Sequence, residues 1–71
     1  MYRVKWKVNG IRKDVVEYGD GYFYLHMYAK GTEDVITRVY GPYSNEYDAN
    51  VDATTIWGED NPVVEFISAE E

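Results

Sequence analysis

The sequence predicts an α+β fold in a single domain over residues 1–71. We expect an antiparallel meander of four strands, then one helix packed on the sheet, then a short C-terminal strand. Three observations support this prediction. Apolar and polar residues alternate with period two in short segments before residue 41. Glycine-containing turns separate these segments. One helical pattern and a last apolar run follow them, and strands followed by a helix are typical of α+β domains.

The first two strands are predicted to form a tight hairpin. Residues 2–8 alternate between an apolar face and a basic face, and Asn9 and Gly10 follow them. Asn-Gly strongly favours a type I′ turn, because both central residues of that turn need positive φ. A hairpin folded about this turn places Val4 opposite Val15, so that apolar side chains share one face.

The segment 22–29 splits with period two into two different faces. One face is apolar and is predicted to anchor the core: Phe23, Leu25, Met27 and Ala29. The other face carries three phenols and an imidazole: Tyr22, Tyr24, His26 and Tyr28. We expect residues 35–40 to return antiparallel after a loop, beside this strand. Their core-facing side chains are predicted to be Val35, Thr37 and Val39.

A helix is predicted to follow, with Ser44 or Asn45 as its N-cap, its last turn near Trp57 and Gly58 as its stop. Two stripes compete along this helix. The stripe expected to be buried is Ala49, Ala53, Ile56 and Trp57. The stripe expected to be at least partly exposed is Tyr47, Val51 and Thr54.

The end of the chain is predicted to add one short strand over residues 63–67. Val64 and Phe66 share a face of this strand and are expected to complete the core. Residues 68–71 are acidic and are expected to fray as a tail.

Charge is distributed unevenly along the chain, whose net charge is −6. Five of the seven basic residues lie in the first thirteen positions, whereas the part from residue 41 onward has eight acids and no base. Such a pattern indicates electrostatic steering or a polar partner. With no run of about 20 apolar residues and no charged-then-apolar leader, a cytoplasmic protein is expected.

The residue types exclude several kinds of chemistry. The chain has no cysteine and one histidine, so disulfides, cysteine nucleophiles and zinc–thiolate sites are ruled out. No glycine-rich phosphate loop is present. From Asp48 to Glu59 the oxygen side chains have the spacing of an EF-hand loop, but Ala53 stands where that loop needs glycine. We therefore predict no catalysis, no cofactor and no metal site, and leave open whether the spacing from Asp48 to Glu59 binds a cation.

The composition favours a protein-binding regulator or inhibitor. Eight Tyr, two Trp and two Phe are too many for the core of so short a chain, and tyrosine is enriched where proteins recognise one another. A phage or mobile-element origin and a host partner protein are expected from the small size; a homodimer stays open. The residues predicted for the interface are Tyr22, Tyr24, His26, Tyr28, Tyr47, Val51, Asp48 and Asp52.

Three alternatives stay open at this point. The acids after residue 41 could imitate nucleic-acid phosphates and block a basic protein groove. The basic residues of the first hairpin could instead bind nucleic acid, although a net charge of −6 repels phosphate. The residues of that alternative site are Arg3, Lys5, Lys7 and Arg12. Finally, the tyrosine face of 22–29 could lie under the helix as a second core layer.

Overall fold

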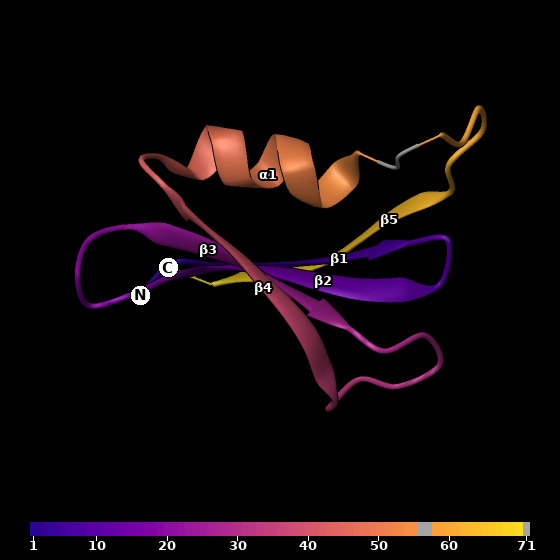
Figure 1. Cartoon of the computed structure of the whole chain (residues 1–71), viewed down its shortest axis with the longest axis horizontal. Coiled ribbons are helices and arrows are strands. Elements are labelled where there is room, and N and C mark those ends of the chain that lie inside the picture. The colour runs from indigo at the N-terminus through magenta and orange to yellow at the C-terminus, as the bar shows by residue number, and fades with distance from the viewer. Residues whose placement is uncertain (56–57, 71) are drawn as a thin grey trace.

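In residues 1–55 and 58–70, which the computed structural model describes, five strands form one antiparallel sheet and one helix lies along it (Figure 1). The elements are β1 (Arg3–Val8), β2 (Ile11–Glu17), β3 (Phe23–Tyr28), β4 (Ile36–Tyr43), α1 (Glu46–Thr54) and β5 (Val64–Glu70). The order across the sheet is β4-β3-β2-β1-β5. The predicted α+β meander with a packed helix is confirmed, and β5 joins the sheet beside β1.

The β1–β2 hairpin has the register that the sequence predicts, with Val4 opposite Val15. Asn9 and Gly10 have φ angles of 51° and 79°, as a type I′ turn requires. Asn9 also forms two hydrogen bonds with Val63, the residue before β5. Its N–H donates to the carbonyl of Val63 at 2.8 Å, and its Oδ1 accepts the Val63 N–H at 2.9 Å. The turn therefore fixes both the hairpin and the start of the last strand.

β5 is longer and more exposed than predicted. Residues 68–70 pair with β1 instead of fraying, because the ladder uses backbone groups and polar side chains do not prevent it. Glu71 lies outside the described residues. Phe66 contacts Trp6 with ring centroids 5.0 Å apart, but it stays 54% exposed. Val64 is exposed as well, since β5 is an edge strand, so these two side chains do not complete the core as expected.

β4 departs from regular alternation at two places. Its pairing with β3 shifts once beside Thr37 and once beside Gly41 and Pro42. These irregular steps change which face the following residues occupy. As a result Val39 lies opposite His26, on the face away from α1. The predicted position of Val39 on the core side is wrong for this reason.

α1 packs on the apolar face of β3 through the predicted pair of alanines. Ala49 and Ala53 are fully buried, in one cluster with core side chains from three strands: Val4, Val15 and Leu25. Small side chains let a helix lie close to a sheet. The helix ends at Thr54, before the predicted end near residue 57, and residues 56 and 57 are not among those described. Within residues 1–55 and 58–70, no helix has the length and apolar character to cross a membrane.

Asn45 is the N-cap of α1, one of the two residues predicted for that role. Its side-chain Oδ1 accepts the Asp48 N–H at 2.9 Å, which satisfies one of the free donors of the first turn. Replacing Asn45 by Ala should lower the free energy of unfolding by about 1 kcal/mol. Urea denaturation measures this, with Ser44→Ala as the control. Equal losses for both variants would contradict the capping role.

Candidate binding surfaces

The face of the sheet opposite α1 carries both the predicted tyrosine row and the basic residues of the alternative nucleic-acid site. Figure 1 shows α1 along one side of the sheet, the side of Leu25. Alternation then directs two sets of side chains to the other side, which we call the open face. Its aromatic and histidine residues on β3 are Tyr24, His26 and Tyr28. Its basic residues on β1 and β2 are Arg3, Lys5, Lys7 and Arg12. The helix therefore does not cover the tyrosine row.

An aromatic cluster lies at one end of the open face. The rings of Tyr18 and Tyr24 have their centroids 4.1 Å apart, and the Tyr18 hydroxyl hydrogen-bonds to Nε2 of His26 at 2.6 Å. The Tyr24 hydroxyl donates to Asp20 at 3.0 Å. Burial lowers the pKa of His26 below its usual value, so the imidazole is neutral at pH 7. His26 therefore adds no positive charge to the cluster at neutral pH.

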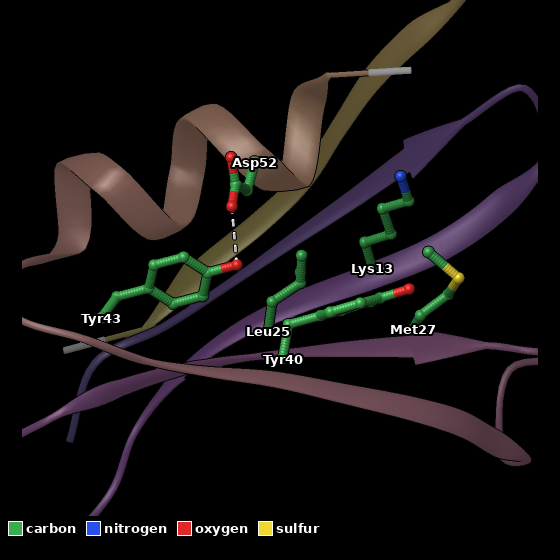
Figure 2. A pocket seen from close by; sticks show the side chains of 6 residues that line it. All are labelled: Lys13, Leu25, Met27, Tyr40, Tyr43 and Asp52. Atoms are coloured by element: carbon green, nitrogen blue, oxygen red, sulfur yellow. Dashed lines mark hydrogen bonds between the residues drawn. The ribbon is translucent and has the colours of Figure 1, made fainter. Parts of the chain in front are cut away.

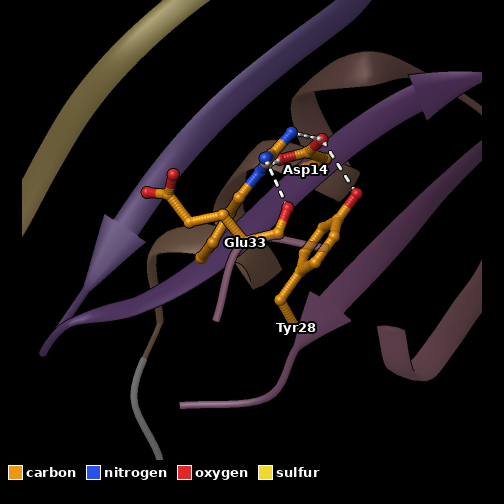
Figure 3. A network of polar contacts seen from close by, with 4 residues as sticks. Asp14, Tyr28 and Glu33 are labelled. Carbon is orange, nitrogen blue, oxygen red and sulfur yellow. Dashed lines mark hydrogen bonds and ion pairs between the residues drawn. The ribbon is translucent and has the colours of Figure 1, made fainter. Parts of the chain in front are cut away.

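Tyr28, at the other end of the row, is buried and its hydroxyl is used inside the protein. It donates to Asp14 at 3.4 Å, and Asp14 is 0% exposed (Figure 3). Arg12 binds the same carboxylate with two hydrogen bonds of 2.9 and 2.8 Å, and its guanidinium lies 4.5 Å from the Tyr28 ring centroid. The pKa of Tyr28 is raised, first because the phenol is buried. We therefore leave Tyr28 out of any interface.

The loop between β3 and β4 engages two of the four predicted basic residues. The Glu33 carboxylate forms an ion pair with Lys7 at 2.9 Å, and the Glu33 carbonyl accepts a hydrogen bond from Arg12 at 2.9 Å. In the part of the chain that the structure describes, Arg3 and Lys5 form no ion pair within 4.0 Å. The register places Glu70 opposite Arg3.

Acids therefore accompany the bases on the open face. Four of them lie on this side or against its bases: Asp14, Glu33, Glu65 and Glu70. Together with Asp20 of the aromatic cluster they outnumber the four basic residues by one, so the open face is close to neutral. A neutral surface lacks the long-range attraction to phosphate on which nucleic-acid binding depends.

The second predicted surface lies on α1, on the other side of the molecule. Tyr47 is 72% exposed and Val51 is also exposed, as the sequence predicts. Asp52 accepts a hydrogen bond from the Tyr43 hydroxyl at 2.7 Å, and Asp48 contacts the cap residue Asn45. Both carboxylates take part in local structure, and they are still accessible to solvent.

The EF-hand interpretation does not hold for the described residues. Asp48 and Asp52 lie within α1, whereas an EF-hand needs them in a loop that wraps the ion. Residues 1–55 and 58–70 also hold no group of three His, Asp or Glu side chains that could share a metal ion.

Sequence reasoning missed two residues of the open face, Tyr18 and Val39. Tyr18 follows β2, where its N–H donates to the Tyr22 carbonyl at 2.9 Å, and its ring contacts that of His26. Val39, 53% exposed, reaches the open face because of the shift at Thr37. We define the aromatic patch as Tyr18, Tyr22, Tyr24, His26 and Val39.

Comparison of the chain with protein-family models, curated proteins and solved structures gives no significant match.

Proposed function

We propose that the protein is a non-catalytic regulator that docks on a partner protein through the aromatic patch. The observation that carries this proposal is an apolar and phenolic surface on a sheet face that the helix leaves uncovered. Tyr22 is 47% exposed, and Val39 beside His26 is more exposed still. Tyrosine offers large contact area with little conformational entropy to lose, so such a surface suits protein recognition.

The patch is also preorganised, which lowers the cost of binding. Tyr24 is held by Asp20 at one end and by the ring of Tyr18 along its face. His26 is fixed by the Tyr18 hydroxyl. Since these side chains are already ordered, a partner does not have to immobilise them when it binds.

The proposal includes no catalytic role and no cofactor. The imidazole of His26 has a phenol as its hydrogen-bond partner, and a protonated phenol is a poor nucleophile. Because the chain has no cysteine, it needs no oxidising compartment, and we place its action in the cytoplasm, on a host protein.

Two matched pairs of variants test the docking surface. Val39→Lys and Tyr22→Ala alter the aromatic patch, whereas Val51→Lys and Tyr47→Ala make the same changes on α1. The protein is immobilised, exposed to host extract, and the retained proteins are quantified by mass spectrometry. We expect the patch variants to reduce retention of a partner at least tenfold, since loss of a central contact costs about 1.4 kcal/mol or more. The α1 variants should retain it.

Three outcomes would overturn the proposal. Loss of the partner with the α1 variants alone would place the interface on the helix, as acidic mimicry of nucleic acid requires. Retention that nuclease treatment abolishes would indicate nucleic-acid binding. Equal retention by all four variants would exclude both surfaces. Thermal unfolding of each variant is measured in parallel, because only folded proteins are compared.

A further inference from the structure

A cavity of about 110 Å³ lies between α1 and the sheet, on the face opposite the aromatic patch (Figure 2). Its lining residues are Lys13, Leu25, Met27, Tyr40, Tyr43 and Asp52. In Figure 2 Lys13 stands at one end, the hydrogen-bonded pair of Tyr43 and Asp52 stands at the other, and Leu25 and Tyr40 lie between them. The two ends are thus polar and the middle is apolar.

The cavity follows from the geometry of the helix. α1 is short, and the side chains that it buries are alanines, which fill little volume. They cover Leu25 and Val15, whereas Met27, further along β3, is only half-buried.

Lys13 is the unusual member of the lining. It lies on the apolar face of β2, opposite Trp6 and Met27, and is only 7% exposed. Among residues 1–55 and 58–70 its ammonium has no hydrogen bond and no ion pair. Burial lowers the pKa of Lys13, and no nearby acid offsets this effect. The ammonium is not cut off from solvent, since none of the buried side-chain nitrogens among the described residues lacks a partner. A largely desolvated cation with no acid beside it still favours an anion that would supply a counter-charge.

We propose that this cavity binds a small monocarboxylate with an apolar body, such as an aromatic or short aliphatic acid. The carboxylate would accept hydrogen bonds from Nζ of Lys13, and the body would lie over Leu25 and Met27 beside the ring of Tyr40. Asp52 at the far end disfavours a second negative charge on the ligand. The cavity is smaller than the cavity of about 150 Å³ that encloses benzene, and it opens to solvent, so a ring-sized body fits with part of its edge exposed.

Three probes of similar shape separate charge from apolar fit. Benzoate, benzyl alcohol and benzylamine are titrated into the natural protein, and methyl NMR signals of Leu25 and Met27 are followed. We expect saturable shifts with benzoate and an affinity roughly tenfold or more above that of benzyl alcohol, because charge-assisted hydrogen bonds are the stronger ones. Equal affinity for the two, tighter binding of benzylamine, or the absence of saturable shifts would overturn the proposal.

Lys13→Met tests the residue itself. It keeps all but the last heavy atom of the side chain and removes the charge, so the preference for benzoate over benzyl alcohol should fall to about twofold or less. Lys5→Met, on the open face, serves as the matched control and should leave the preference unchanged. A preference that survives Lys13→Met or is lost with Lys5→Met would contradict the assignment. If Lys13→Met fails to fold, the comparison of the three probes on the natural chain decides.

Discussion

Replacing Asp14 by Ala should lower the free energy of unfolding by about 3–5 kcal/mol. Asp14 is fully buried and accepts both hydrogen bonds from Arg12, whose side chain is itself largely buried. Without the carboxylate, the guanidinium stays under Tyr28 and the β3–β4 loop with the Glu33 carbonyl as its partner. A domain of this size has a total stability of roughly 4–10 kcal/mol, so Asp14→Ala should be unfolded or close to it at 37 °C.

Urea denaturation followed by tyrosine and tryptophan fluorescence measures this loss, and two further variants test its cause. Glu33→Ala removes the exposed ion pair with Lys7 on the same face and should cost about 0.5 kcal/mol or less, because solvent screens that pair. The double variant Arg12→Met with Asp14→Leu removes both buried charges and should recover most of the stability lost in Asp14→Ala. If the double variant is no more stable than Asp14→Ala, the loss does not come from an unpaired guanidinium.

Asp14 shows what the sequence could and could not predict. The position of Asp14 opposite Lys5 follows from local alternation and from the Asn-Gly turn, and the structure confirms it. Its burial could not be predicted in this way. It depends on Arg12, two residues away, and on the loop residue Glu33, which is brought over the sheet only when β3 and β4 pair. Burial by residues from a distant segment produces no periodic pattern in the sequence.

The predictions agree with the structure where residue type and spacing within one segment determine the element. The cap at Asn45 and the buried Ala49 and Ala53 follow from residue type and spacing, and both are observed. The prediction failed on β4 and β5, where backbone pairing with a neighbouring strand decides. Residues 68–70, expected to fray, extend the sheet instead, and the shift at Thr37 moves Val39 to the other face. A rule of period two cannot anticipate an inserted residue.

Only the part of the candidate site that lies along one strand could be predicted from the sequence. The row of Tyr24 and His26 follows from alternation along one strand, and its location opposite α1 required knowing which face the two alanines would cover. The engagement of Lys7 and Arg12, which makes nucleic-acid binding less favourable, depends on contacts with Glu33 that connect distant segments.

Gly41→Ala should destabilise the protein by about 3 kcal/mol and disturb the aromatic patch as well. Gly41 has a φ of 140°, a backbone conformation that other residues rarely adopt. A Cβ at this position would lie 2.7 Å from Cδ2 of Tyr24 and 3.2 Å from the carbonyl oxygen of Phe23. The Tyr24 ring cannot move aside freely, because Tyr18 packs on it and Asp20 holds its hydroxyl.

Gly19→Ala is the matched control, since a Cβ there has no atom within 4 Å and its φ lies outside the left-handed region. Its stability should change by about 0.5 kcal/mol or less. Chemical denaturation measures both variants, and the NMR signals of the Tyr24 ring report its displacement in Gly41→Ala. Because the ring belongs to the aromatic patch, partner retention should fall in Gly41→Ala even under conditions where the variant is fully folded. Equal stability of the two variants, with the Tyr24 signals unchanged, would show that the close approach of β4 to Tyr24 does not position the patch.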